Sequence, residues 1–455
     1  MRIHFIGIGG IGVSALARYY LEKGHKVSGS DLVSSEITQA LKKKGAKIFI
    51  GPHLARTVPA NADLVIYSPA VQKSNPELKT SANNRGRTPI IMSYPEALGE
   101  LTKEHFTIAV SGTHGKSTTT SMLGLLLAKA GLDPTVIVGT KIKEFANSNC
   151  RVGKSKSESR NDGTKLKKRT KSSLPYLVIE ADEHFASFLN YWPKIIVLTN
   201  IEADHLDYYQ NLNNILKAFK RYIGHLPKDG LLIANKDDKN IKNLAREAIP
   251  SRFYSVKQPE AKKLRKILKV PGEHNVSNAL AVLTVARILG IKDKAIFSAL
   301  ASYKGCWRRF EEKTYKIPNT KYKIQVISDY GHHPTEVLAT LKAAREKYPK
   351  KKIWCVFQPH QYQRTYFLFK DFVKSFRLSP IDKIIITDIY DVAGREEKKI
   401  KGKVNSEKLV KTAKRKNVIY MSKENILDYL KENISDFEVL IIMGAGDIYK
   451  IISNF

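Results

Sequence analysis

Cysteine is scarce in this chain, and its scarcity argues against two kinds of protein. The three cysteines, Cys150, Cys306 and Cys355, are odd in number and far apart in the sequence. A disulfide-stapled secreted domain needs several cysteines at short spacings, and a structural zinc site needs cysteine or histidine pairs a few residues apart. We therefore expect neither a disulfide framework nor a zinc site.

Long apolar runs are also absent. No stretch of the sequence reaches the roughly 20 apolar residues that a membrane-spanning helix needs. The apolar start, F-I-G-I-G-G-I-G (Phe5–Gly12), has the glycine spacing of a strand, turn and helix, and no polar cleavage region of a signal peptide follows it. We expect a cytoplasmic protein without a membrane partner.

Acidic residues are few beside 77 Lys and Arg, and the formal net charge is +34. Such a charge is typical of nucleic-acid-binding proteins, but also of proteins that act on small anions. The lysines recur in nearly every segment, and no RNA- or DNA-binding motif is present, so we favour small anionic partners over nucleic acid. The strongest basic run, Lys154–Lys171, has almost no apolar residues and predicts a mobile surface loop. RNA binding through this loop is the alternative of a different class.

The sequence alternates buried strands with helices over its whole length, which predicts an α/β fold. At 455 residues the chain is long enough for about three domains. Met92–Leu101 is expected to be a connection between the first domain and the second. The predicted strands are Arg2–Ile8, Lys26–Gly29, Asp63–Tyr67, His105–Val110, Tyr176–Ile179, Ile195–Leu198, Leu231–Asn235, Ile324–Ser328, Ile353–Phe357, Lys383–Asp388, Val418–Met421 and Val439–Met443. Predicted helices include Val13–Lys23, Ser121–Ala130 and Pro334–Lys347, and another starts within Pro271–Ala281.

A glycine-rich stretch, S-G-T-H-G-K-S-T-T-T (Ser111–Thr120), lies between a predicted strand and a predicted helix. In this setting Gly112 and Gly115 let backbone N–H groups turn inward around phosphates. Lys116 can reach the terminal phosphates, and the hydroxyl of Ser117 can bind Mg²⁺. The loop is shorter than the standard pattern, because Val110 stands where that pattern has glycine. We predict a nucleotide site here, and an incidental glycine-rich turn is the weaker alternative.

A second glycine motif stands near the start of the chain. Gly7, Gly9 and Gly12 form G-x-G-x-x-G, with Gly10 as an extra glycine, and Asp31 follows the next strand. This pattern predicts a diphosphate at a helix N-terminus and a carboxylate near a ribose, but not which nucleotide is bound. An NAD-dependent dehydrogenase is therefore an alternative. Ser68 lies in the loop after a third strand, at the sheet edge where such folds bind ligands.

Carboxylates and a histidine follow two strands of the second domain. Glu180 and Asp182 come after one strand, and His205 comes after the next. Beside a nucleotide loop, Glu180 and His205 are candidate Mg²⁺ ligands, and strand-end capping or surface salt bridging is the structural alternative.

Polar clusters continue toward the C-terminus. His274, Asn275 and Asn278 lie near a predicted helix start, where amide groups can read an adenine edge or simply cap the helix. Arg308 and Arg309 lie at a predicted hinge and could clamp a phosphate on closure. Further clusters follow four strands, and several of them facing one cleft would form a substrate site. These clusters span Asp329–Glu336, Gln358–Thr365, Asp388–Glu396 and Gly444–Ile448.

In this order, the motifs resemble those of the Mur ligases of bacterial peptidoglycan synthesis, over nearly the full length. The C-terminal pair H-H-P-T-E and F-Q-P-H is typical of the alanine-adding type. The motifs that carry the resemblance are G-x-G-G-x-G (Gly7–Gly12), G-T-H-G-K-S-T-T (Gly112–Thr119), E-A-D-E (Glu180–Glu183), T-N-I-E-A-D-H-L-D (Thr199–Asp207), G-E-H-N-V-S-N-A (Gly272–Ala279), R-R-F (Arg308–Phe310), D-Y-G-H-H-P-T-E (Asp329–Glu336), F-Q-P-H-x-Y-x-R-T (Phe357–Thr365) and G-A-G-D-I (Gly444–Ile448).

The resemblance implies three domains: residues 1–101 for a UDP sugar, 102–302 for ATP and 303–455 for an amino acid. The first and third are expected to be Rossmann-like, and the second a P-loop ATPase-like parallel sheet. The implied reaction joins L-alanine to the lactyl carboxylate of UDP-N-acetylmuramate through an acyl phosphate, with ATP and Mg²⁺ as cofactors. A murein-peptide recycling ligase is the alternative within the family. We expect a monomer or a homodimer.

The resemblance also assigns roles by position. The implied nucleotide contacts are Gly112, Thr113, His114, Gly115, Lys116, Ser117, Thr118, His274, Asn275, Asn278 and Asp329. The implied Mg²⁺ ligands are Ser117, Glu180 and His205, and the implied γ-phosphate contact is Arg308 or Arg309. The implied UDP-sugar contacts are Gly7, Gly9, Gly10, Gly12, Asp31 and Ser68, and His332, His333 and Arg364 are expected at the acyl phosphate and the amino acid.

The motifs depart from the family pattern at three places. His184 and Phe185 follow Glu183 where many relatives have Ser-Asp, so a carboxylate near the metal is missing. Gln361 stands where relatives often have arginine, which bears on the contact to the amino-acid carboxylate. Ser328 replaces a frequent aspartate.

Overall fold

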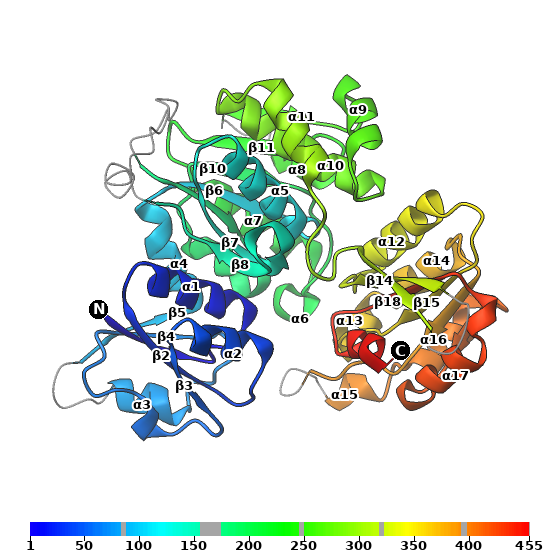
Figure 1. The fold of residues 1–455 in the computed structure, drawn as a ribbon, viewed down its shortest axis with the longest axis horizontal. Coiled ribbons are helices and arrows are strands. Elements are labelled where there is room, and N and C mark those ends of the chain that lie inside the picture. The colour runs from blue at the N-terminus through cyan, green and yellow to red at the C-terminus, as the bar shows by residue number, and fades with distance from the viewer. Residues whose placement is uncertain (83–87, 155–173, 245–249, 318–322, 393–397, 455) are drawn as a thin grey trace. The chain divides into compact units, whose positions relative to one another are not determined.

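Three β-sheets, each flanked by helices, carry the fold (Figure 1). The computed structural model describes residues 1–82, 88–154, 174–244, 250–317, 323–392 and 398–454. The chain groups into two compact units, of which the first holds two sheets and the second holds one. The first unit is Met1–Asn200, Lys217–Ser255 and Ala281–Leu300, and the second is Ile201–Leu216, Val256–Leu280 and Ala301–Phe455.

The N-terminal sheet is entirely parallel, with strand order β3-β2-β1-β4-β5. Ile3 to Ile6 of its central strand are buried on both faces, as a parallel sheet covered by helices requires. Its strands are β1 (Arg2–Ile6), β2 (Lys26–Asp31), β3 (Lys47–Ile50), β4 (Leu64–Tyr67) and β5 (Ile90–Ser93). The helices of this segment are α1 (Ile11–Glu22), α2 (Glu36–Lys43), α3 (Pro76–Ala82) and α4 (Tyr94–Lys103).

The expected connection over Met92–Leu101 is the end of β5 and most of helix α4, which leads from the first sheet to β6 of the second. Ser93 and Glu96 form a capping box in which each side chain accepts a hydrogen bond from the other's backbone N–H. Pro95 stands in the first turn, where its missing N–H costs nothing. S-Y-P-E is therefore a helix start.

The second sheet has the order β12-β11-β10-β6-β9-β7-β8 and is parallel apart from the β7–β8 hairpin. The strands are β6 (Phe106–Ser111), β7 (Thr135–Ile142), β8 (Ser148–Arg151), β9 (Tyr176–Glu180), β10 (Ile195–Leu198), β11 (Leu231–Asn235) and β12 (Ser251–Tyr254). The helices along this part of the chain are α5 (Lys116–Lys129), α6 (Leu206–Tyr209), α7 (Leu212–Ile223), α8 (Lys239–Leu244), α9 (Pro259–Ile267), α10 (Glu273–Ile288) and α11 (Asp293–Ser302).

The third sheet, in the second unit, has the order β13-β14-β18-β15-β16-β17 and is parallel apart from the β13–β14 pair. Its strands are β13 (Glu311–Lys316), β14 (Lys323–Asp329), β15 (Ile353–Phe357), β16 (Lys383–Ile386), β17 (Val418–Tyr420) and β18 (Val439–Met443). Its helices are α12 (Pro334–Lys347), α13 (Tyr362–Phe367), α14 (Phe369–Arg377), α15 (Lys398–Lys401), α16 (Ser406–Ala413) and α17 (Ile426–Glu432).

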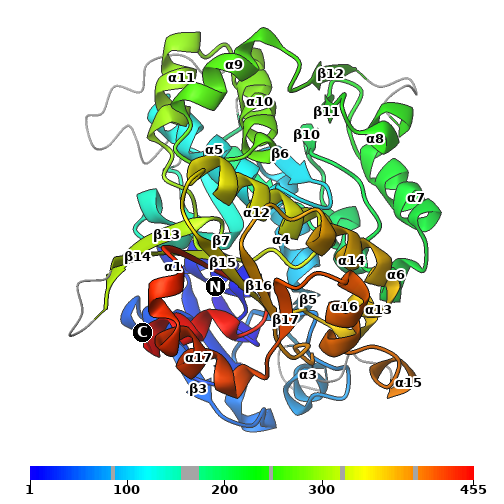
Figure 2. The same ribbon diagram turned by 90° about the vertical axis from the view of Figure 1, so that its right-hand side faces the viewer.

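Strand β15 shows how this sheet builds a core on both of its faces. Cys355 and Phe357 pack in one cluster with residues of α12, α14 and α16, whereas Trp354 and Val356 pack in a second cluster with α17. Alternate side chains of a strand point to opposite faces, so a fully apolar strand requires helices on both sides. Figure 2 shows α12, α14 and α16 around this sheet, together with α17.

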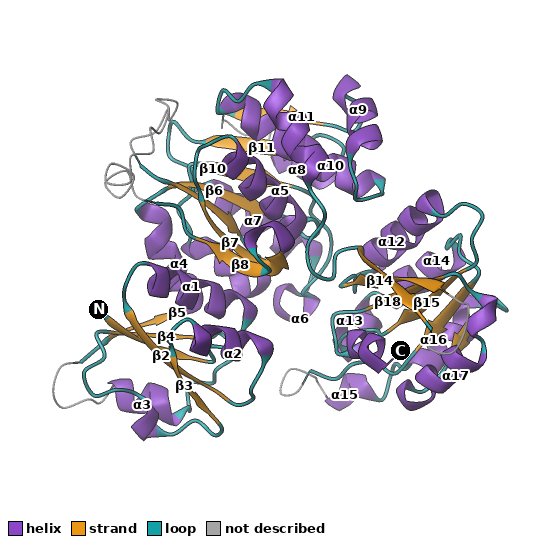
Figure 3. Cartoon of the chain, in the orientation of Figure 1, coloured by secondary structure: helices purple, strands orange, loops and turns teal. Residues whose placement is uncertain are grey.

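The predicted α/β class is confirmed, and Figure 3 shows helix and strand alternating along the chain. The described residues also form short 3-10 helices: η1 (Ala55–Thr57), η2 (Lys143–Phe145), η4 (His184–Asn190), η5 (Lys423–Asn425), η6 (Ile434–Asp436) and η7 (Ile448–Asn454). The domain boundaries remain predictions. Apart from Lys154, the basic run 154–171 lies outside the described residues. Among the helices described, none has the length and apolar character needed to cross a membrane.

Candidate functional site

The glycine-rich loop between β6 and α5 has the backbone of a phosphate cradle. Gly112 and Gly115 both have positive φ, of 131° and 82°, which L side chains rarely adopt. A Cβ at Gly112 would collide with Thr199 and with the backbone of Asn200. Gly115 begins α5 without a side-chain cap, so the first N–H groups of the helix face the loop as an anion site would need.

The end of strand β10 holds this loop in place. The backbone carbonyl of Asn200 accepts from the N–H of Thr113 at 2.9 Å, and its side-chain oxygen accepts from the N–H of His114 at 2.8 Å. The Thr199 hydroxyl donates to the carbonyl of His114 at 2.6 Å. Sequence reasoning gave Thr199 and Asn200 no role, although both stand in the quoted T-N-I-E-A-D-H-L-D motif.

The ammonium group of Lys116 uses its donors on three groups of the first unit. It donates to the carbonyls of Gly112 at 2.7 Å and Thr113 at 3.2 Å, and to the carboxylate of Glu183 at 2.7 Å. Asp182 lies further off, at 3.5 Å. Burial alone would lower the pKa of Lys116, but the carboxylates of Glu183 and Asp182 outweigh it and raise that pKa, so the lysine is charged.

Glu183, which sequence reasoning did not assign a role, is the partner that a phosphate would have to replace. Its side chain is buried, and burial raises the pKa of Glu183 to about 8 against the opposing effect of Lys116. The signal for it was present in the E-A-D-E motif.

Two of the three predicted Mg²⁺ ligands meet within the first unit. The Ser117 hydroxyl donates to both oxygens of the Glu180 carboxylate, at 2.9 and 3.0 Å, and the N–H of Gly139 fixes that carboxylate at 2.8 Å. A hydroxyl and a carboxylate beside a phosphate loop are the hard oxygen donors that Mg²⁺ prefers. The third predicted ligand, His205, belongs to the second unit, where it caps α6 with a φ of 51°.

The N-terminal glycine loop, between β1 and α1, is held by β2. The N–H groups of Gly7 and Ile8 donate to the carbonyl of Ser30 at 2.9 and 3.0 Å, and Asp31 accepts from the N–H of Gly9 at 2.8 Å. Gly10 begins α1 without a side-chain cap. A Cβ on Gly7 would press on Ser68, and one on Gly12 would press on Tyr94. The structure thus brings Gly7, Gly9, Gly10, Gly12, Asp31 and Ser68 together around one helix N-terminus.

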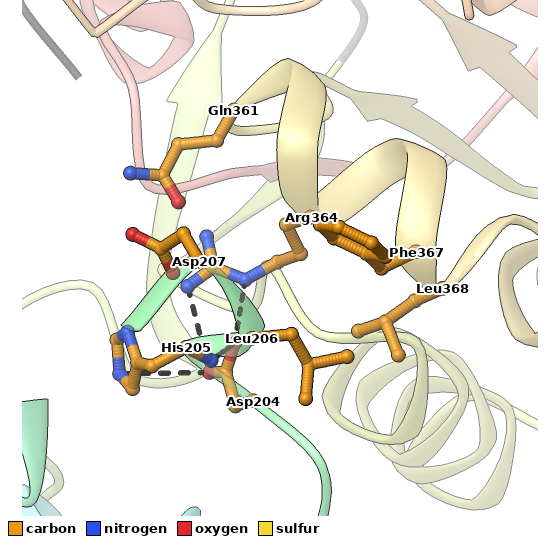
Figure 4. Close-up of a pocket in the computed structure, with 8 residues that line it drawn as sticks. All are labelled: Asp204, His205, Leu206, Asp207, Gln361, Arg364, Phe367 and Leu368. Carbon is orange, nitrogen blue, oxygen red and sulfur yellow. Dashed lines mark hydrogen bonds and ion pairs between the residues drawn. The ribbon is translucent and has the colours of Figure 1, made fainter. Parts of the chain in front are cut away.

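In the second unit, Arg364 forms a buried ion pair with Asp204 (Figure 4). The guanidinium Nε donates to Oδ1 of Asp204 at 2.9 Å, and both side chains are nearly sealed from solvent. Burial alone would raise the pKa of Asp204, but Arg364, with His205 and other histidines, holds it well below its usual range. A small cavity of about 10 Å³ beside the pair is also lined by Gln361. Asp204 was missed because its partner is 160 residues away in sequence.

Two histidines beside this pair are neutral. Burial lowers the pKa of His332 to about 3 and that of His360 to about 2. Nδ1 of His332 lies 3.1 Å from the carbonyl of Tyr330, so this nitrogen carries the proton and Nε2 is the acceptor. His333 instead caps α12: its Nδ1 accepts from the N–H of Thr335 at 3.3 Å.

The two adjacent arginines differ in their surroundings. Arg308 is buried, with its guanidinium 4.2 Å from the ring centroid of Tyr449, and donates to the carbonyl of Gly446 at 3.3 Å. Arg309 is half-buried over the ring of Tyr330. Asp329 fixes this turn by accepting from the N–H of Phe310 at 2.7 Å, and burial raises the pKa of Asp329.

The predicted adenine contacts, at the start of α10, serve the helix itself. The Asn275 side chain donates to the carbonyl of Pro271 at 2.7 Å, and the Asn278 amide lies 3.5 Å from the side-chain oxygen of Asn275. His274 is exposed. Both asparagines are buried. Both asparagines therefore form contacts at the start of the helix. Their binding of adenine stays a prediction.

The three departures from the family pattern lie in different surroundings. Phe185 is 43% exposed, has a φ of 51° and stacks on His184 with ring centroids 4.1 Å apart. Gln361 is buried and has a φ of 72°, a value that favours glycine. Ser328 is buried at the end of β14.

Comparison with known protein families divides the chain into three matches. Residues 2–106 match the Mur ligase family, catalytic domain; residues 110–286 match the Mur ligase middle domain; and residues 308–446 match the Mur ligase, glutamate ligase domain.

Curated relatives match over nearly the whole chain. A UDP-N-acetylmuramate--L-alanine ligase of Clostridium acetobutylicum is 41% identical, and one of Clostridium kluyveri is 38% identical. Each alignment covers 99% of this chain and 96% of the relative. Among solved structures, UDP-N-acetylmuramate-alanine ligase MurC of Thermotoga maritima has a TM-score of 0.75 and 29% identity, with 100% of this chain and 98% of that chain covered.

Proposed function

Because this chain belongs to the Mur ligase family, we propose that it joins L-alanine to UDP-N-acetylmuramate with cleavage of ATP to ADP and phosphate, in peptidoglycan precursor synthesis. ATP use is a property of the family. The proposal rests on the full-length match, at about 40% identity, to relatives named UDP-N-acetylmuramate--L-alanine ligase.

The phosphate loop supports this chemistry. The lactyl carboxylate of the sugar attacks the γ-phosphorus of ATP, the bond to the β-phosphate oxygen breaks, and an acyl phosphate and ADP result. The amine of alanine then attacks the acyl carbon, loses a proton, and phosphate leaves. Negative charge builds up on the phosphoryl oxygens in the first step, so fixed cationic and N–H groups are what the protein must supply.

The first unit supplies such groups. We place Lys116 on the β- and γ-phosphates, with the N-terminus of α5 and the N–H groups of Gly112 to Thr118 around them. Ser117 and Glu180, with His205 from the second unit, would hold Mg²⁺. When bound there, Mg²⁺ would neutralise phosphate charge and orient the γ-phosphate. The N-terminal glycine loop, with Asp31 and Ser68, would hold the diphosphate and ribose of the UDP sugar.

The second unit would supply the remaining contacts. Arg309 is better placed than Arg308 to reach a phosphate, because Arg308 is buried among aromatic rings. The neutral His332 can accept a hydrogen bond from the amine of alanine at Nε2. Arg364 and His333 are proposed near the acyl phosphate. His274, Asn275, Asn278 and Asp329 are proposed near the nucleoside.

The test is phosphate release from ATP at fixed Mg²⁺, with UDP-N-acetylmuramate and one amino acid at a time. We expect release that requires the sugar and is strongest with L-alanine. A separate assay replaces alanine with a tripeptide, because a murein-peptide ligase would prefer the tripeptide as its substrate.

Two variants sharpen this experiment. Lys116→Ala should abolish release without unfolding the chain, because the phosphates lose their cation. Lys103→Ala removes an exposed lysine that pairs with Glu100 at the surface, and it should leave release unchanged. Strong release with the tripeptide but not with alanine would overturn the alanine assignment, and full release by Lys116→Ala would overturn the phosphate-loop assignment.

A further inference from the structure

A cavity of about 640 Å³ lies in the first unit, outside both glycine loops. One wall is formed by helices α1 and α2, and the other by the β7–β8 hairpin. Asn149 of the hairpin joins the two walls at one end by donating to the Ser14 hydroxyl of α1 at 2.9 Å. The cavity is of the size of common small-molecule sites.

Arg18 of α1 lines this cavity. The side chain is only 8% exposed, and its Nε has no hydrogen-bond partner among the described residues. Burial lowers the pKa of Arg18, while the nearby Cys150 and Glu22 oppose this. A buried guanidinium without an acceptor is costly, so an oxyanion that satisfies it would bind with a large gain.

The other cations around the cavity already have carboxylate partners. Lys44 pairs with Glu22 at 2.7 Å, and Lys141 pairs with Glu36 at 2.8 Å. Arg151 pairs with Asp133. Among the cations that line the cavity, Arg18 could therefore bind an anion without breaking an ion pair between described residues.

The same cavity also offers apolar surface. Ile37 and Ala40 of α2 face it, as do Phe145 and Val152 of the hairpin segment. No lining residue comes from Gly7–Gly12 or from Gly112–Thr118, so the cavity is distinct from the two proposed phosphate sites.

We propose that this cavity binds a small molecule with an oxyanion group, a phosphate or a carboxylate, on an apolar body, with Arg18 as the anchor of the oxyanion. Arg18 receives the oxyanion through its fork of N–H groups, and Ile37 and Phe145 contact the apolar body. An occupant would contact both walls and brace the contact between the N-terminal and second sheets.

The test is calorimetric titration of the full chain with phenyl phosphate, benzoate and phenol as probes. Phenyl phosphate and benzoate distinguish a phosphate from a carboxylate, and phenol lacks the charge. We expect at least one charged probe to bind, phenol to bind at least tenfold more weakly, and Arg18→Met to weaken the charged probe at least tenfold. Arg18→Lys should bind with intermediate affinity.

Two matched variants locate the binding. Arg56→Gln removes an exposed arginine from the same sheet domain and should bind as the wild type does. Lys116→Ala should also bind unchanged, which excludes the phosphate loop as the site. Without probe, Arg18→Met should melt at or above the wild-type temperature, because it removes a buried charge that has no acceptor.

Several outcomes would overturn the proposal. Equal affinity in the wild type and Arg18→Met, loss of binding in Lys116→Ala, or no binding of either charged probe at 10 millimolar would each do so. A markedly lower melting temperature for both Arg18→Met and Arg18→Lys would assign Arg18 a structural role instead.

Discussion

The ammonium of Lys116 lies 2.7 Å from a carboxylate oxygen of Glu183 inside the candidate phosphate site, where Glu183 is buried and the Lys116 side chain is 11% exposed. A nucleotide phosphate that binds Lys116 must take the place of this carboxylate. The lysine is therefore held in position by a group that also competes with the ligand.

The first prediction concerns pH. Burial raises the pKa of Glu183 above that of a free carboxyl, so the share of ionised Glu183 grows as the pH rises through neutrality. Ionised Glu183 competes with phosphate for Lys116, so ATP affinity without Mg²⁺ should fall as the pH rises from 7 to 9. Glu183→Gln should remove this fall. Binding is measured by calorimetry at several pH values.

A surface variant provides the control for this pH effect. Glu100→Gln changes an exposed glutamate that pairs with Lys103 and should keep the wild-type pH profile. If Glu183→Gln shows the same decline as the wild type, the competition between Glu183 and phosphate does not exist.

The second prediction concerns the metal. Glu180 is fixed by Ser117 and by the N–H of Gly139, so its carboxylate is oriented before any ion binds. Glu180→Gln should raise the Mg²⁺ concentration for half-maximal phosphate release by at least about tenfold, and Ser117→Ala should raise it less. Glu104→Gln, an exposed glutamate near the same sheet, should leave the Mg²⁺ requirement unchanged. A Mg²⁺ titration for Glu180→Gln that overlays the wild type would exclude this carboxylate as a ligand.

Much of the fold could be predicted, because its strands are continuous apolar runs. The predicted bounds of Ile195–Leu198, Leu231–Asn235, Ile353–Phe357 and Val439–Met443 agree with those of β10, β11, β15 and β18. Helix α12 was also predicted with its bounds, since Pro334 stands in its first turn. By contrast, S-N-C-R of β8 carries no strand pattern, and its conformation comes from pairing with Val136 and Ile137 of β7. A strand that forms only through such pairing cannot be recognised from its own residues.

In the candidate site, too, the parts that are close together in sequence could be predicted, and the contacts made by folding could not. The glycine loops could be predicted, because Gly112 and Gly115 lie close in sequence to Lys116 and Ser117. Their supports could not: Ser117 meets Glu180 across 63 residues, and Arg364 meets Asp204 across 160. Such partners are defined only when the chain is folded.

The third prediction concerns that long-range pair. Asp204 is 6% exposed and Arg364 is 7% exposed, so removing one charge leaves the other buried and uncompensated. Asp204→Asn should lower the free energy of unfolding by about 3–5 kcal/mol, whereas Asp204→Leu combined with Arg364→Met should recover most of the loss. Unfolding in urea is followed by the fluorescence of Trp354, which is buried in the same unit.

Acid provides a second readout of this pair. The pKa of Asp204 is held well below its usual range, so its stabilisation is complete above the unfolded pKa and is lost as pH falls through the folded one. Asp207→Asn, which changes an exposed carboxylate three residues away, should leave both readouts unchanged. Wild-type stability in Asp204→Asn would contradict the prediction.

The fourth prediction concerns Glu77, which is fully buried beneath the N-terminal sheet. Its oxygens accept from the hydroxyls of Ser30 at 2.6 Å and Thr57 at 2.5 Å, and Nε2 of His4 lies 3.5 Å away. Burial would raise the pKa of Glu77, but the contacts with His4, Ser30 and Thr57 lower it to about 2. The carboxylate thus stays ionised where an unfolded glutamate would take up a proton.

The lowered pKa makes the N-terminal sheet acid-sensitive in a defined window. Stabilisation by Glu77 is complete above the unfolded pKa near 4.5 and is lost as pH falls toward about 2, a loss of roughly 3 kcal/mol. Hydrogen exchange of peptides from β1 and β2, corrected for intrinsic rates, should show protection falling between pH 5 and pH 3 in the wild type. Glu77→Gln should be less protected at pH 6 and change less with pH, because it has no charge to lose. Parallel pH profiles for the wild type and Glu77→Gln would mean that other carboxylates cause the acid sensitivity.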